Sequence, residues 1–299
     1  MRLRYVARPL RLLCRAASAL LLAGLSVACQ DEEQRVEPPG PVGSCSGFSR
    51  SAVVTRLAFT REGPKGVAPG FNLDGVVSIS EDAGSCKKKD FVDEEGRPGI
   101  DNQLAALIPD IEALVGDAVD GLVQGAINDG LLLITLDLEG VDDLKNDPCI
   151  GLKVGLAQGK PNLGTDGVIE GFQTFVARKD VIPSHGEHGR IEDGLLTIGP
   201  MNVDVPLKLF DVSFTLHLYD AYFRFRVDEE GYLDGYLGGG LIPEELIEGI
   251  QDGAGLYKII PLLRNILHAS ADLKPNAEGV CQQVSITVAI QAAPAFLLR

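Results

Sequence analysis

Pairs of an acidic residue and glycine recur through the body of this 299-residue chain and constrain its fold more than any other feature. Glycine accepts positive φ and Asp can cap its own turn, so such pairs are typical of tight turns between strands. They separate short runs rich in Val, Ile, Leu, Phe and Thr, and include Asp74-Gly75, Glu95-Gly96, Asp129-Gly130, Asp166-Gly167, Asp193-Gly194, Glu230-Gly231 and Asp234-Gly235. The pattern predicts many short antiparallel strands.

We therefore expect a mainly β (α+β) fold, with antiparallel sheets in a sandwich- or barrel-like arrangement. The clearest hairpin turns at 228–231, where apolar Phe223, Phe225 and Val227 precede the turn and alternate with polar neighbours. The strands are expected near 51–60, 71–80, 131–139, 150–157, 168–178, 202–210, 212–219, 221–228, 232–238 and 282–291.

Two regions break this rhythm with helical spacing. Apolar residues recur every three or four positions over 109–127 and predict an amphipathic helix that begins at Pro109. The stretch 243–268 predicts two short helices around Gly253–Gly255, with Pro261 kinking the second. These helices are expected to cover a sheet face.

The N-terminus has the composition of a secretory signal. Five arginines and no acid occupy 1–15, and 16–28 is an apolar stretch too short to span a bilayer as a helix. Its end, Leu25-Ser26-Val27-Ala28-Cys29, resembles the lipobox of bacterial lipoproteins, although Ser26 stands where that family usually has Leu. The resemblance, which covers residues 1–29 only, implies cleavage before Cys29 and lipidation of its thiol. The alternatives are an ordinary cleaved signal and a retained membrane anchor.

This reading divides the chain into a signal peptide (1–28), a lipidated Cys29 with a flexible acidic and Pro-rich spacer (29–43), and one globular β-rich domain (44–299). By resemblance to lipoprotein sorting, Gln30 favours the outer membrane. Removing five arginines from 27 basic residues leaves 22 against 42 acids, a net charge of −20. Such a field repels phosphates, so we expect no nucleic acid partner.

Four cysteines remain in the predicted domain: Cys45, Cys86, Cys149 and Cys281. An even number in an exported chain indicates two disulfides, and the sequence leaves three pairings open. Buried free thiols are the alternative.

Two kinds of metal site are candidates. His185 and His188, expected in an irregular loop, supply two imidazoles for zinc or copper, although their spacing fits no named motif. The acidic stretches 90–101 and 137–147 offer carboxylates for calcium, although the first fails the ligand pattern of a calcium-binding loop. Solvated polar loops are the simpler interpretation, and no cofactor is expected.

One face of the predicted hairpin is a candidate binding surface. It combines three tyrosines with two arginines in an otherwise acidic protein, and comprises Tyr222, Arg224, Arg226, Tyr232, Asp234 and Tyr236. Such rings and guanidinium planes can stack on sugars or clamp a carboxylate. The simpler alternative is cross-strand pairing of Arg224 or Arg226 with Asp234.

The sequence thus predicts a membrane-anchored envelope lipoprotein that acts as a non-enzymatic binding or structural module, with an envelope protein, glycan or lipid as its unidentified partner. A periplasmic carrier of lipids or other hydrophobic ligands is the first alternative, because apolar helices and strands can line a cavity. A secreted hydrolase is the second, but no nucleophile or nucleotide motif supports it.

Overall fold

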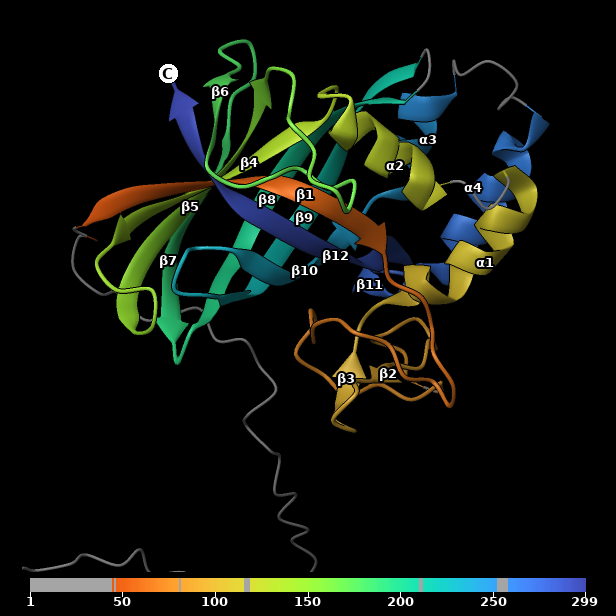
Figure 1. The fold of residues 1–299 in the computed structure, drawn as a ribbon. Helices are drawn as coiled ribbons and strands as arrows, with labels where there is room; N and C mark the ends of the chain where they lie inside the picture. The colour runs from red at the N-terminus through yellow and green to blue at the C-terminus, as the bar shows by residue number, and fades with distance from the viewer. Residues whose placement is uncertain (1–44, 46, 81, 116–118, 210–211, 252–257) are drawn as a thin grey trace, which may run out of the picture. The chain divides into compact units, whose positions relative to one another are not determined.

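The computed structural model describes residues 45, 47–80, 82–115, 119–209, 212–251 and 258–299, so the predicted signal, Cys29 and spacer lie outside the described residues. The fold is mainly β, as predicted, and eight long antiparallel strands close into a barrel (Figure 1). Around the barrel they are β1 (Phe48–Phe59), β4 (Leu133–Val141), β5 (Asp147–Gln158), β7 (Ser184–Glu192), β8 (Leu195–Leu209), β9 (Val212–Val227), β10 (Leu233–Leu241) and β12 (Cys281–Leu298).

The barrel closes because β1, the first strand, pairs with β12, the last strand. A short strand, β6 (Gln173–Ala177), pairs with both β5 and the end of β12, and β11 (Leu273–Pro275) pairs with the start of β12. Closure leaves the barrel without a free sheet edge between its first and last strands.

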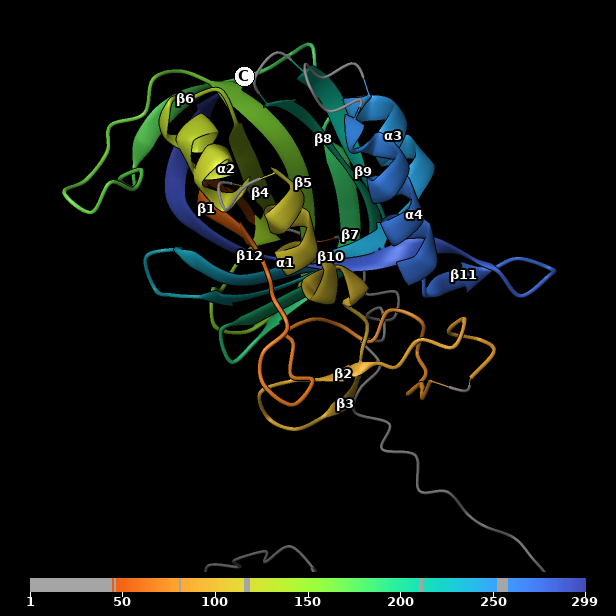
Figure 2. The same ribbon diagram turned by 90° about the vertical axis from the view of Figure 1, so that its right-hand side faces the viewer.

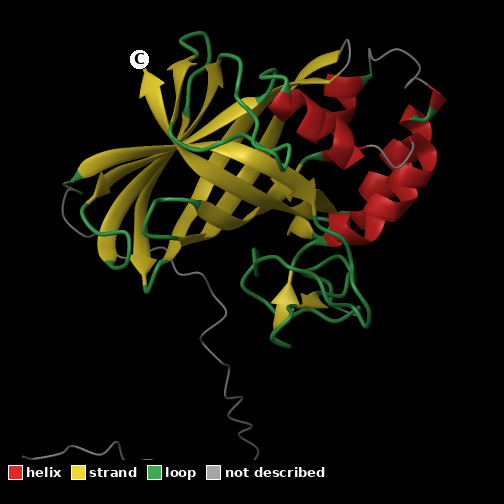
Figure 3. Ribbon diagram, in the orientation of Figure 1, coloured by secondary structure: helices red, strands yellow, loops and turns green. Residues whose placement is uncertain are grey.

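Four helices gather at one end of the barrel (Figure 3): α1 (Gln103–Val115), α2 (Val119–Asn128), α3 (Pro243–Ile250) and α4 (Ile260–Ser270). In the view of Figure 2, α1 and α2 lie across the barrel opening. Helix α2 contacts both β1 and β8, which stand on opposite sides of the barrel. Its buried face, Val123, Ala126 and Ile127, therefore closes this end of the core.

The predicted helix over 109–127 needs correction, because α1 begins at Gln103 and contains Pro109. Its start is fixed by a tertiary contact that the local pattern does not reveal: the Ser285 hydroxyl accepts a hydrogen bond from the Gln103 N–H at 2.7 Å. Residues 116–118, between α1 and α2, lie outside the described residues. Pro261 lies in the first turn of α4 rather than kinking it, and Gly253–Gly255 are likewise outside the described residues.

The strand predicted over 71–80 was wrong, and so was the break predicted between the strands 212–219 and 221–228. The stretch 71–80 forms turns and an isolated bridge from Phe71 to Asp101. The runs 212–219 and 221–228 are one strand, β9. Its inward positions switch from even to odd numbers around Asp220, which has a positive φ of 48° at a shift in register. The extra residue of a β-bulge shifts the alternation without ending the strand, so two predicted strands are one.

Residues 60–102, which we call the covering segment, lie over the outer surface of the barrel beside β9, β10 and β12. They contain the small sheet β2 (Phe91–Val92) and β3 (Pro98–Ile100), which has a minor apolar core of its own with Ala68 and Ala105. The buried side chain of Asn102 joins the segment to the barrel. It donates to the Thr60 hydroxyl and the Pro69 carbonyl, and accepts from the Thr287 N–H.

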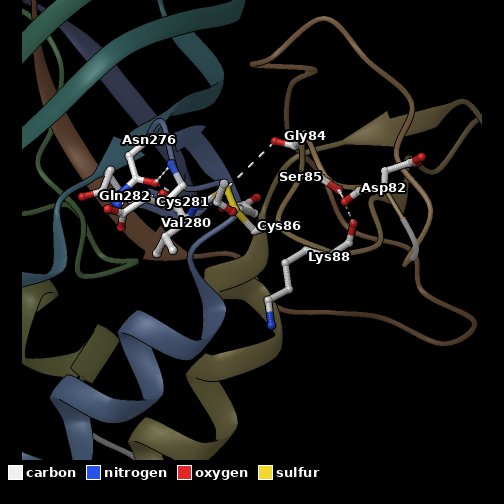
Figure 4. Close-up of a disulfide and its surroundings, with 12 residues drawn as sticks. Asp82, Gly84, Ser85, Cys86, Lys88, Asn276, Val280, Cys281 and Gln282 are labelled. Atoms are coloured by element: carbon white, nitrogen blue, oxygen red, sulfur yellow. Dashed lines mark hydrogen bonds between the residues drawn. A yellow bond between two sulfur atoms is a disulfide. The ribbon is translucent and has the colours of Figure 1, made fainter.

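Both predicted disulfides form, and the structure selects the pairing. Cys45 is joined to Cys149, and Cys86 is joined to Cys281. The second bond ties the covering segment to β12, as Figure 4 shows. Disulfides are typical of proteins that fold in an oxidising, exported compartment.

Side chains fill the barrel. One contiguous cluster of buried apolar residues draws on all eight barrel strands and all four helices, with Phe223 and Phe225 among its largest members. Among the described helices, none is long and apolar enough to cross a membrane.

Candidate binding face

The predicted binding face lies on the outside of the barrel, across the β9–β10 hairpin. Arg226 stands directly opposite Asp234, and Arg224 stands opposite Tyr236. The intervening Phe223 and Phe225 point into the core, where each is 1% exposed. Alternation along the two strands thus places the polar side chains together on the outer surface.

Half of this face is covered. The Phe71 ring of the covering segment stacks on Tyr222 at a centroid distance of 6.2 Å. Phe71 also lies 4.9 Å from the Arg224 guanidinium carbon, a cation–π contact. Arg224 donates to the Gly70 carbonyl at 3.0 Å, and burial lowers its pKa. Phe71 can approach β10 closely because Gly238 has no side chain; a Cβ at this position would collide with the Phe71 ring. Tyr222 and Arg224 therefore hold the covering segment in place.

The other half is open and is extended by two strands that the sequence did not link to it. Four polar side chains stand side by side on adjacent strands: Arg226 on β9, Asp234 on β10, Gln291 on β12 and Arg56 on β1. We call them the outer polar row. With a strand spacing of about 4.8 Å, the row spans about 14 Å.

All four side chains of the row are exposed. Within the part of the chain that the structure describes, none of them forms a side-chain hydrogen bond or an ion pair with the protein. The cross-strand neighbours Arg226 and Asp234 are therefore in register without forming the ion pair that the simpler alternative requires. The row presents donors and acceptors that are free to meet another molecule.

Two clefts flank the row, and Arg226 and Asp234 line both. The first cleft, of about 980 Å³, lies between the loop 164–171, the turn 193–194 and the start of β10. The second, of about 500 Å³, is bordered by the covering segment at 93–97 and contains Tyr236. This surface combines two hollows with unengaged polar groups, which are properties of a binding site.

Each cleft has a tyrosine. Tyr232 lies in the first, 36% exposed, where its ring meets Phe172 edge-on at 6.2 Å and its backbone N–H donates to Asp228 at 2.8 Å. Tyr236 is half-buried in the second, where burial and the nearby Glu94 and Asp234 charges raise the pKa of its hydroxyl. Its hydroxyl therefore stays protonated and can donate a hydrogen bond at neutral pH.

The two histidines do not lie in the expected loop, because 184–192 forms strand β7. His185 lies 3.5 Å from Glu139 and 3.9 Å from Glu187, and His188 lies 3.9 Å from Glu187. The Lys153 ammonium already occupies the Glu139 carboxylate at 2.6 Å. Among the described residues, no group of three or more His, Cys, Asp or Glu is arranged to hold a metal ion.

The acidic stretches considered for calcium mostly serve turns and ion pairs. Asp93 caps the turn to Arg97 and pairs with its guanidinium at 2.6 Å. Asp147 accepts N–H groups of its own turn, and Asp137 pairs with Arg299 at 2.8 Å. Asp90 and Asp101 are different, because they are buried within the covering segment, and burial raises the pKa of both.

These buried carboxyl groups do not resemble a hydrolase site. Burial raises the pKa of Asp90 and of Asp272 to about 7, as a catalytic acid would require. However, Asp90, Asp101 and Asp272 are not among the described residues that line the two clefts. Their position favours a structural role in or beside the covering segment.

The sequence predicted five of the residues that line the two clefts (Arg224, Arg226, Tyr232, Asp234, Tyr236) but did not predict Arg56 and Gln291. Both missed residues lie on strands far from the β9–β10 hairpin in sequence, so no local pattern links them to it. No protein-family model matches this chain, and neither a curated protein nor a solved structure matches it.

Proposed function

We propose that this protein is a non-enzymatic binding protein of the cell envelope, anchored by lipid on Cys29, that recognises a polar partner through the outer polar row. The observation that carries the proposal is the row itself: Arg226, Asp234, Gln291 and Arg56 are aligned, exposed and unengaged beside two clefts. On an ordinary sheet face, oppositely charged neighbours satisfy each other.

The lipid-carrier alternative receives less support. A carrier needs an internal apolar cavity, whereas side chains from every wall of this barrel form one packed cluster. The two clefts beside the row contain charged side chains, including Arg226 and Asp234. A surface-binding role therefore accounts for more of the described structure.

The anchor follows from the lipobox resemblance and agrees with the disulfides, which indicate an exported protein. The acidic, Pro-rich spacer after Cys29 would hold the binding face away from the bilayer. Outer-membrane placement is part of the same proposal, on the basis of Gln30.

The test is co-sedimentation of the full chain with purified peptidoglycan, outer-membrane vesicles and envelope proteins. We expect one fraction to retain the wild type and the double variant Arg226→Ala/Asp234→Ala to lose retention. The matched control is Arg178→Ala/Asp180→Ala, which removes an exposed ion pair of the same residue types away from the clefts. Equal retention of wild type and row variant, or no retention by any fraction, would refute the proposal.

A further inference from the structure

The outer polar row offers a balanced set of hydrogen-bonding groups. Two guanidinium groups donate, the Asp234 carboxylate accepts, and the Gln291 amide does both. A ligand that matches them must present donors and acceptors at short intervals along the row. Hydroxyl groups on a sugar ring do this, because each hydroxyl both donates and accepts.

Charge around the row selects against ionic ligands. Acidic residues outnumber arginines in both clefts. The first has five acids against Arg56 and Arg226, and the second has four against Arg97, Arg224 and Arg226, so an anion would meet net negative charge at both. A cation would meet the Arg56 and Arg226 guanidinium groups in the row. A neutral polar ligand meets neither penalty and can use both signs of charge through charge-assisted hydrogen bonds.

The two tyrosines add apolar surface on either side of the row. The edge-on contact with Phe172 and the turn at Asp228 fix the position of the Tyr232 ring. Its hydroxyl lies against Gly171, where any side chain would collide with it. Rings positioned in this way can pack against the apolar faces of sugar rings with little loss of conformational freedom.

We infer that the ligand of the outer polar row is a neutral oligosaccharide that lies across β9, β10, β12 and β1 between Tyr232 and Tyr236. This inference rests on the proposed function and specifies its ligand class. The binding needs no bond-making step, and the length of the row accommodates several linked sugar units rather than one.

The experiment is isothermal titration calorimetry of the full chain with a panel of neutral oligosaccharides: chitotetraose, cellotetraose and maltotetraose. Oligogalacturonate of the same length serves as the anionic comparison. We expect at least one neutral member to bind, and Arg226→Ala/Asp234→Ala or Tyr232→Ala to weaken that binding at least tenfold. Arg178→Ala/Asp180→Ala should leave it unchanged.

The outcomes separate this inference from the proposed function. The inference is overturned if no neutral member binds in a manner sensitive to the row variants, or if only oligogalacturonate binds. Retention on the envelope-protein fraction that depends on Arg226 and Asp234 but persists with excess neutral saccharide would overturn it as well, while leaving the proposed function intact. If the row variants affect neither measurement, both fail.

Discussion

Raising the pH from 5 to 7 should destabilise this protein, because buried carboxyl groups near the covering segment must lose their protons. Asp272, which follows α4, is 3% exposed. It accepts hydrogen bonds from the backbone N–H and the hydroxyl of Ser285, at 2.8 and 2.5 Å. Burial outweighs these bonds and raises its pKa to about 7, and the nearby Asp90 charge adds to the effect.

The sign follows from proton binding. Between the ordinary pKa of an aspartate, near 4, and the folded value of about 7, the folded state holds a proton that the unfolded state has released. Stability is therefore highest at the acidic end of this window and falls as pH rises. For one such group, the free energy of unfolding drops by about 2 kcal/mol from pH 5 to pH 7. The raised pKa values of Asp90 and Asp101 act in the same direction.

The assay is urea unfolding at several pH values and constant ionic strength, with the free energy extrapolated to water. Asp272→Asn should flatten the slope between pH 5 and pH 7 by about 2 kcal/mol, because it removes the titrating group but keeps an acceptor oxygen. The control is Asp180→Asn, since Asp180 is exposed and Arg178 lowers its pKa below this window. A wild-type stability that stays constant or rises from pH 5 to pH 7 would show that the reasoning is wrong.

Three further predictions concern the covering segment and the anchor. Asn102→Ala should lower the free energy of unfolding by about 3 kcal/mol, because the buried groups that now bond to Asn102 would lose their hydrogen-bond partner. Urea titration measures this change, and a loss under about 1 kcal/mol would contradict the prediction. Replacing Cys86 and Cys281 by Ser should lower the free energy of unfolding by about 2–5 kcal/mol and speed amide hydrogen exchange over 72–101 more than in the barrel strands. An equal increase in exchange across both regions would contradict the prediction that this disulfide mainly holds the covering segment. Cys29→Ser should abolish the lipid mass increment and release the protein from membranes, whereas continued sedimentation with membranes would rule out the lipid anchor.

Local pattern predicted much of the barrel. The alternation of Phe223, Phe225 and Val227 with polar residues predicted both the strand and the face it buries, because neighbouring side chains on a strand point to opposite sides. The short turn at 228–231 also predicted that Arg224 or Arg226 faces Asp234 across the strands, and the structure selects Arg226. Both inferences depend on residues close in sequence.

Elsewhere, non-local contacts decided the secondary structure, and prediction from the local pattern failed. The polar, Gly-containing stretch 184–192 lacks a strand pattern, but it forms β7 because β5 and β8 supply hydrogen-bonding partners on its two sides. The stretch 71–80 has apolar residues at strand-like intervals, but Asp101 bonds the Leu73 and Asp74 N–H groups and draws it into turns.

The sequence by itself determined the fold class and the polar surface of the β9–β10 hairpin. Its even number of cysteines also predicted two disulfides, which are typical of exported proteins. Only the tertiary structure decided which cysteines pair, across separations of 104 and 195 residues. It alone also brought Arg56 and Gln291 into line with Arg226 and Asp234. The reason is barrel closure, which pairs the first strand with the last, and no local periodicity encodes that long-range pairing.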